Sequence, residues 1–321
     1  MRTNLKQLTI TIAALFMVVA VNPLLQGQVT NGVFLSGASP YGSTYAQWSA
    51  AWWRWNFSLP TTNSPIQDTA PFSTGQGGPV WFIGGTFGLG GNQSRIRSGS
   101  VPEGAALLIG IMESWADDAN CPVPDGYTTA QLRSLAASAQ DPAFAMSCTI
   151  DGLNTVDLNG TPNAYRVQSP VFNYTAPGVH NYLYDLFGAT CYFNPGGNYA
   201  INGAVADGVY LMVAPLSPGA HTIHFSGSYP VTIFPFTVIY VQDITCNLTV
   251  VATPALAMSV QGAQLILSWP QAASWFVLET SSSLSPPNWV PAGFPVQPAG
   301  NLNQVSVPIG NGSQFFRLKQ I

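Results

Sequence analysis

The chain has 321 residues, and only 7% of them are charged, against about 25% in a typical soluble protein. Thirteen acidic residues outnumber nine basic ones, which argues against nucleic acid and anionic membranes as partners. Serine, threonine, asparagine, glutamine and glycine must therefore solvate most of the surface, as suits an exported protein that meets uncharged ligands.

Residues 1–27 have the pattern of a secretory signal peptide. Arg2 and Lys6 precede the apolar run LTITIAALFMVVAV, and the small residue Gly27 stands where cleavage is expected. The run has 14 residues, and a helix needs roughly 20 to cross a bilayer. We therefore predict a protein secreted to the cell envelope or beyond, with no transmembrane anchor in the mature chain.

The segment YGSTYAQWSAAWWRWNFSLP, residues 41–60, predicts a helix. Thr44 and Gln47 have the spacing of a capping box, which marks the start of the helix. Pro60 marks its end, because proline cannot continue the helical hydrogen bonds.

The tryptophans of this helix lie on two sides. At 100° per residue, Trp48, Trp52 and Trp55 share one stripe, which is too large an apolar patch to leave in water. We expect this stripe to pack on a sheet, with Arg54 and Asn56 facing outward. Three other rings are the candidate ligand-binding residues, one on the second side of the helix and two at strand positions: Trp53, Trp81 and Trp115.

Seven or more short runs rich in β-branched and aromatic residues follow, separated by glycine and proline. Runs such as HTIHF alternate with the period of 2 that is typical of half-buried strands. They predict a mainly β domain at residues 28–250, an antiparallel β-sandwich or jelly roll with one or two helices. The second helix is expected at TTAQLRSLAASA, where Thr128 and Gln131 again have capping-box spacing.

A cluster of oxygen-bearing side chains follows the predicted strand ALLIGIMESW. Such hard ligands suit calcium, although no EF-hand spacing is present and solvated loop acids are the simpler interpretation. The possible calcium ligands are Glu113, Asp117, Asp118, Asn120 and Asp125.

No metalloprotease, nucleophile-elbow or phosphate-loop motif is present. His221 and His224 stand at i and i+3 of a predicted strand, so they point to opposite faces and cannot hold one metal ion together. The enzymatic alternative is glycoside cleavage, which needs two carboxyl groups about 5 to 9.5 Å apart. The candidate pair comes from three acids: Glu113, Asp117 and Asp207.

Four cysteines lie in the mature chain, and export to an oxidising compartment favours two disulfides. Three pairings are possible. The pairing of nearest neighbours, Cys121 with Cys148 and Cys191 with Cys246, is the one we expect.

Residues 255–321 predict a second, smaller unit. They contain one acid, Glu279, and no cysteine, and Pro254 interrupts any continuing strand. The motifs LILSWP, FVLETSSSL, PPNW and FFRL resemble a C-terminal accessory module of many secreted bacterial proteins. The resemblance implies a small fibronectin-like or immunoglobulin-like β-sandwich without chemistry of its own.

A second resemblance covers residues 41–228. The motifs YGSTYAQWSAAWWRW, GPVWFIGGTFG, VPEGAALLIGI, YRVQSPVF and LSPGAHTIHFSG resemble a family of exported bacterial proteins of unknown function. That family supplies no activity or functional residue.

These features predict an exported, non-catalytic β-sandwich protein that binds a carbohydrate or another cell-surface component through residues 28–250. One alternative is a polysaccharide-cleaving jelly-roll enzyme that uses loop carboxylates. The other is a structural envelope protein without a small ligand, attached through its C-terminal module.

Overall fold

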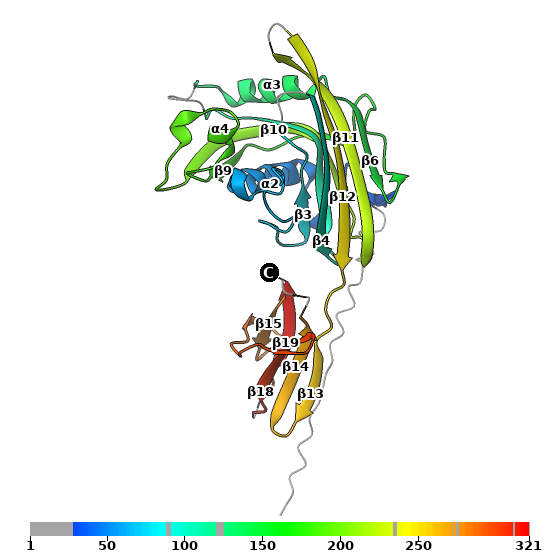
Figure 1. Cartoon of the computed structure of the whole chain (residues 1–321), viewed down its shortest axis with the longest axis vertical. Coiled ribbons are helices and arrows are strands. Elements are labelled where there is room, and N and C mark those ends of the chain that lie inside the picture. Colours follow the sequence, from blue (N-terminus) through cyan, green and yellow to red (C-terminus); the bar gives the residue numbers. More distant parts are fainter. Residues whose placement is uncertain are drawn as a thin grey trace, which may run out of the picture.

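A computed structural model describes residues 28–87, 91–119, 125–233, 236–271, 273, 276–310 and 312–320. The described chain is mainly β, as predicted (Figure 1). Two large sheets form a main sandwich, which ends at Val251, and two small sheets form a C-terminal module, which begins at Ala257.

The first large sheet, here called sheet A, has β10 at its centre, which pairs antiparallel with β2, β5, β8 and β9. The strands of sheet A are β1 (Val29–Thr30), β2 (Val33–Phe34), β3 (Val80–Ile83), β5 (Ala106–Ala116), β8 (Arg166–Gln168), β9 (Phe172–Ala176) and β10 (Tyr199–Val213).

The second large sheet, here called sheet B, has the order β4-β12-β11-β6-β7. Its strands are β4 (Gly91–Pro102), β6 (Phe144–Ile150), β7 (Leu153–Asn154), β11 (Gly219–Ile233) and β12 (Phe236–Val251). Two neighbouring pairs are parallel instead of antiparallel, β3 with β5 and β4 with β12. The chain passes from β3 through β4 in sheet B before it returns to sheet A, so β3 and β5 run in the same direction.

The C-terminal module repeats the sandwich on a small scale around its own core of Leu267, Trp269 and Leu278. One sheet has β13 (Ala257–Gln261), β14 (Gln264–Pro270), β17 (Gln297–Ala299) and β18 (Leu302–Pro308), and the other has β15 (Phe276–Ser281), β16 (Val290–Pro291) and β19 (Phe315–Gln320).

Helices cover sheet A beside β10 (Figure 1). The helices and helical turns are η1 (Pro40–Gly42), α2 (Tyr45–Ser58), η2 (Thr61–Asn63), α3 (Thr129–Gln140), α4 (Tyr182–Asp185) and η3 (Thr190–Tyr192). Both predicted capping boxes are present, at Thr44 with Gln47 and at Thr128 with Gln131. Within the described residues, no helix has the length and apolar character to cross a membrane.

Helix α2 is buried on more sides than its tryptophan stripe predicts. Trp52 and Trp55 are buried as expected, and Trp48 is half-buried. The outward orientation expected for Asn56 is wrong, because its side chain is 0% exposed. Arg54 is exposed, as expected. Strands β5, β8, β9 and β10 of sheet A all lie against α2.

The tryptophans of α2 are fixed by hydrogen bonds as well as by packing. Trp52 Nε1 donates to the carbonyl of Ile83 at 2.9 Å, and Trp53 Nε1 donates to the Tyr210 hydroxyl at 2.9 Å. Buried indole N–H groups need such partners. The helix is thereby tied to strands β3 and β10 of sheet A.

The expected disulfide pairing is wrong. Cys148 in β6 and Cys246 in β12 are free, buried thiols that lie on either side of β11. Cys191 is disulfide-bonded, and Cys121 lies outside the described residues. Nearness in sequence misleads here because β6 and β12 place the two thiols in the core between the sheets.

Replacing Trp52 with alanine is expected to lower the free energy of unfolding by about 3–5 kcal/mol, because it empties a buried ring site. Urea denaturation of the purified chain measures the loss. Phe236→Ala, at a ring that is 71% exposed, is the control and should change stability by less than about 1 kcal/mol. A loss below about 1 kcal/mol for Trp52→Ala would contradict the packing of α2.

Cys148 and Cys246 should resist thiol reagents in the folded protein. Burial raises the pKa of each thiol to about 12, and the thiolate is the reactive form. Alkylation followed by peptide mapping should find both thiols unmodified in native buffer and both modified in denaturant without reductant. Modification at equal rates in the two conditions would contradict their burial.

Candidate functional site

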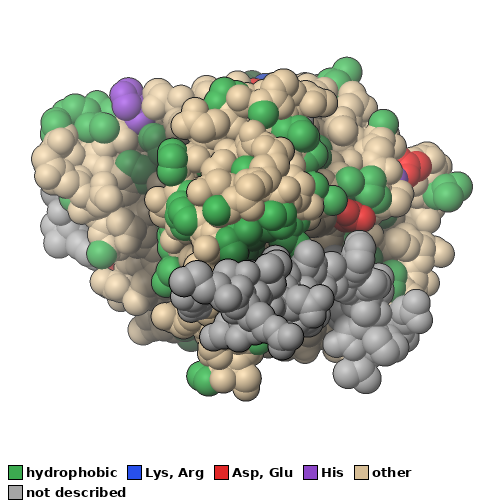
Figure 2. Space-filling view, turned by 90° about the horizontal axis from the view of Figure 1, so that it is seen from below, with side chains coloured by type: hydrophobic (Ala, Val, Ile, Leu, Met, Phe, Trp, Pro, Cys, Tyr) green, Lys and Arg blue, Asp and Glu red, His purple; other side chains and the backbone are tan. Residues whose placement is uncertain are grey.

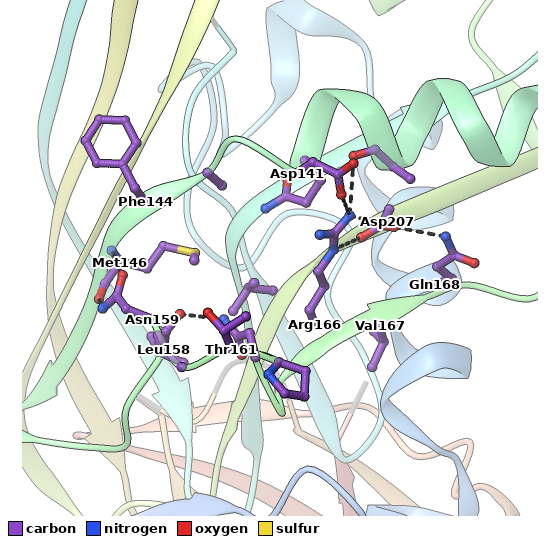
Figure 3. Close-up of a pocket in the computed structure, with 17 residues that line it drawn as sticks. Asp141, Phe144, Met146, Leu158, Asn159, Thr161, Arg166, Val167, Gln168 and Asp207 are labelled. Atoms are coloured by element: carbon purple, nitrogen blue, oxygen red, sulfur yellow. Dashed lines mark hydrogen bonds and ion pairs between the residues drawn. The ribbon is translucent and has the colours of Figure 1, made fainter.

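A cavity of about 640 Å³ opens in the main sandwich between the end of α3, strand β6, the loop at 158–163 and strand β8 (Figure 3). Its walls combine apolar side chains, side-chain amides and three charged groups. Cavities of this size, lined by apolar groups with a few fixed polar ones, are typical of small-molecule sites. We call it the α3–β8 cavity.

Arg166 organises the charges of the cavity, and Figure 3 shows it between two carboxylates. Its Nε donates to Asp207 Oδ1 at 2.7 Å and its Nη2 donates to Asp207 Oδ2 at 3.2 Å. The same Nη2 donates to Asp141 Oδ1 at 2.7 Å and to the carbonyl of Ala137 at 3.3 Å. The guanidinium therefore also holds the C-terminal turn of α3.

Asp207 projects from the buried strand β10 and is 2% exposed. Besides the two bonds from Arg166, it accepts one from Gln168 Nε2 at 3.1 Å. Strand β8 supplies both donors because it pairs with β10 over Asp207 to Val209. A buried carboxylate needs such partners, since an unpaired charge in the interior is unfavourable.

The loop at 158–163 is held against β6 by an amide. Asn159 Nδ2 donates to the carbonyl of Met146 at 2.8 Å, and Asn159 Oδ1 accepts from the Met146 N–H at 2.9 Å. The side-chain amide thus makes the pair of backbone hydrogen bonds that a neighbouring strand would make. One rim of the cavity is therefore fixed before any ligand arrives.

Phe144 and Gln140 complete the lining. Phe144, at the start of β6, is 45% exposed. Ala145 has a positive φ of 52° and the pairing with β11 shifts register nearby, so a bulge re-aims Phe144 relative to the strand that follows. Gln140 is 3% exposed, and its Nε2 has no hydrogen-bond partner among the described residues.

Of the three candidate catalytic acids, only Asp207 lies in the cavity. Glu113 pairs with Gly208, the residue after Asp207, so Glu113 and Asp207 point to opposite faces of sheet A. Asp117 accepts bonds from Trp115 Nε1 at 2.9 Å and from the Tyr174 hydroxyl at 2.6 Å. The three carboxyls do not converge on one site.

Glu113 is a half-buried residue whose carboxyl end is buried. Its carboxyl lies so close to Gly110 that a Cβ there would stand 2.9 Å from Glu113 Cδ. Burial raises the pKa of Glu113 from 4.5 to about 8. Its Oε2 has no hydrogen-bond partner in the described structure, so the group is held neutral near pH 7.

The proposed calcium ligands are only partly described. Asp118 accepts from the Gly126 N–H at 3.1 Å, and Asn120 lies outside the described residues. The described chain brings no three or more His, Cys, Asp or Glu side chains together in a metal-binding arrangement. Calcium binding by Glu113, Asp117, Asp118, Asn120 and Asp125 stays a prediction.

The two neighbouring histidines bind different carboxylates, as their spacing predicts. His221 Nδ1 lies 2.8 Å from Asp151 Oδ2, and His224 Nε2 lies 2.6 Å from Asp243 Oδ1. The hydrogen bond with Asp151 raises the pKa of His221.

The three candidate ligand-binding tryptophans belong to the core instead of the cavity. Trp53 is 1% exposed, so its expected surface position is wrong. Trp81 is also buried. Trp115 is half-buried, with its ring centroid 5.2 Å from that of Trp53 and 4.9 Å from that of Phe187. Trp53 and Trp115 pack on each other because the fold brings α2 against β5.

Sequence reasoning missed Gln140, Phe144 and Arg166. Phe144 precedes the regular part of β6 and gave no periodic signal, because a bulge changes its direction. The sequence holds one signal for Arg166. The chain has nine basic residues for thirteen acidic ones, so each basic residue is a candidate partner for a buried acid. The partners of Arg166, 25 and 41 positions away, are set only by the fold.

Glu113→Gln is expected to stabilise the protein increasingly as pH rises. The unfolded carboxyl ionises near pH 4.5 and the folded one near 8, so the wild-type group lowers stability progressively between these values and by a constant amount above them. Urea denaturation should show a gain for Glu113→Gln at pH 8 at least about 2 kcal/mol larger than at pH 5.

Glu103→Gln is the matched control for this pH series, because the Glu103 carboxylate lies at an exposed site, where it accepts from the Thr253 N–H at 2.8 Å. It should show no comparable growth of stability with pH. A flat difference between Glu113→Gln and wild type would mean that Glu113 ionises normally.

Arg166→Met should destabilise the protein by about 3 kcal/mol or more at pH 7, because it leaves the buried Asp207 carboxylate without its cation. Asp141→Asn, at a side chain that is 65% exposed, should cost less than about 1 kcal/mol. Adding Asp207→Leu to Arg166→Met should recover part of the loss. Equal effects of Arg166→Met and Asp141→Asn in urea denaturation would contradict the assigned roles.

Comparison with known proteins identifies no family. No family model and no curated protein matches the chain. Among solved structures, the chain is similar to bovine butyrophilin over 37% of its own length, at 12% sequence identity and a TM-score of 0.15. The match spans 63% of the butyrophilin chain, less than two thirds of it. A likeness this weak carries nothing about function, which has to be inferred from the cavity.

Proposed function

We propose that this chain is an exported, non-catalytic β-sandwich protein that binds carbohydrate in the α3–β8 cavity. The observation that carries the proposal is the lining itself, which joins an exposed aromatic ring, Phe144, to the buried amide of Gln140 and the half-buried guanidinium of Arg166. Sugars present apolar C–H faces and a rim of hydroxyls, so they need both kinds of contact.

The charge of the cavity favours an uncharged ligand. Arg166 binds Asp141 and Asp207 together, so one positive charge meets two negative ones. An anion would face the carboxylates without a free cation to receive it. The surface agrees, since Figure 2 shows a face on which uncharged polar and hydrophobic atoms predominate and charged side chains are few.

The buried carboxylate of the cavity, Asp207, is arranged for structure. Asp207 receives three hydrogen bonds from Arg166 and Gln168, so its lone pairs already have donors. General acid–base catalysis needs a carboxyl that can exchange a proton with the substrate. This arrangement supports binding without cleavage.

Export is part of the proposal and is supported by residues 1–27, whose basic start and apolar run have the pattern of a signal peptide. Outside the cytoplasm, polysaccharides are the abundant uncharged polymers of cell surfaces. The C-terminal module offers a separate unit for attachment.

Pull-down of the purified chain on a panel of polysaccharides, with released reducing ends assayed in the same tubes, tests the proposal. We expect binding to at least one polysaccharide without release of reducing ends. Phe144→Ala should weaken binding about tenfold, which corresponds to about 1.4 kcal/mol. The matched variant Phe236→Ala, at an exposed ring outside the cavity, should bind like wild type.

Release of reducing ends would replace the proposal with the enzymatic alternative. Absence of binding to every polysaccharide would favour the structural envelope protein. Equal binding by Phe144→Ala and wild type would move the site away from the α3–β8 cavity.

A further inference from the structure

The cavity holds a polar group that the fold leaves unsatisfied. Gln140 ends α3, lines the cavity and is almost fully buried, yet its Nε2 donates to no acceptor in the described structure. Buried donors of this kind are rare in folded proteins and call for a reason. The terminal torsion of a glutamine is soft, so this amide can turn toward a ligand in the cavity.

The same cavity has an apolar wall. Met146, Leu158 and Val209 line it and are buried. A ligand that offered only a hydroxyl to Gln140 would leave these side chains without an apolar partner. The lining calls for an acceptor oxygen and a small apolar group on the same part of the ligand.

An acceptor for an N–H group is also present. The Asp141 carboxylate lines the cavity with 65% of its side chain exposed. It receives one described hydrogen bond, from Arg166 at 2.7 Å, and a carboxylate has lone pairs for several. Asp141 can therefore accept from a ligand amide.

We infer that the α3–β8 cavity selects N-acetylated sugars, with the acetamido group of one sugar unit in the cavity. Its carbonyl oxygen accepts from Gln140 Nε2, its methyl group packs on Met146, Leu158 and Val209, and its N–H donates to Asp141. Phe144 at the rim takes the apolar face of the sugar ring. This inference rests on the proposed carbohydrate binding and deepens it, because it names the class of sugar.

Calorimetric titration of the full chain with three oligosaccharides of equal length tests the inference. The probes are an oligomer of N-acetylglucosamine, the fully deacetylated glucosamine oligomer and a cello-oligosaccharide. We expect the acetylated oligomer to bind at least about tenfold more tightly than either other probe, the size expected when a buried donor gains or loses its acceptor.

Gln140→Met keeps the length of the side chain and removes the donor. It should reduce binding of the acetylated oligomer about tenfold and leave binding of the cello-oligosaccharide within twofold of wild type. Gln140→Glu, which replaces the donor with an acceptor, should weaken the acetylated oligomer at least as much. Circular dichroism and urea denaturation check that both variants fold, and Phe236→Ala is the surface control.

The outcomes separate the two proposals. Equal affinity for the acetylated and cello-oligosaccharides, with both weakened by Phe144→Ala, overturns the acetamido inference and keeps the carbohydrate site. Tighter binding of the deacetylated oligomer overturns it in favour of a cationic sugar bound by the carboxylates. Binding of none of the three, together with none in the polysaccharide panel, overturns both.

Discussion

The structure depends on a carboxylate in a strand that is buried on both faces. Strand β10 is buried without interruption from Ala204 to Val213, and Asp207 lies within that run. A charge in such a place is tolerated only with a fixed partner. Arg166 supplies it from β8, and the same guanidinium reaches Asp141 and the end of α3. One ion-pair network therefore sets where β8 and α3 lie on sheet A.

The cavity is a consequence of that network. The guanidinium fixes the end of α3, and Asn159 fixes the loop at 158–163 against β6. Two walls are thereby held apart, and the space between them is lined by Gln140 and Phe144. A site assembled on rigid elements suits a binding protein, because little conformational freedom remains to be lost when a ligand enters. The carbohydrate proposal rests on the lining of the cavity, and this rigidity agrees with it.

The face of sheet A that helix α2 covers is stabilised mainly by buried aromatic rings. Helix α2 presents large rings, and their burial stabilises the sandwich through apolar area. Each deeply buried indole also needs an acceptor, which Ile83 and Tyr210 provide for Trp52 and Trp53. The tryptophan cluster is thus core, and its apparent similarity to a sugar platform comes only from composition. The exposed aromatic ring that lines the cavity is Phe144, in strand β6 of sheet B.

The sequence by itself determined the features that depend on neighbours along the chain. The two capping boxes, the helix after Thr44, the mainly β class and the opposite directions of His221 and His224 all follow from local spacing. The burial of the Trp52 stripe was predictable for the same reason, because it follows from helical periodicity. Calcium binding and export are sequence predictions of the same local kind.

Only the tertiary structure decided what depends on distant partners. Trp53 is buried because Trp115 of β5 and Tyr210 of β10 pack against its ring. Cys148 and Cys246 are free, and strand order places them on either side of β11. The cavity joins Gln140, Phe144 and Arg166 to Asp207 from separate elements, and a single bulge decides the direction of Phe144. Local sequence patterns do not predict these features, because strand pairing and burial are set by the free energy of the whole chain.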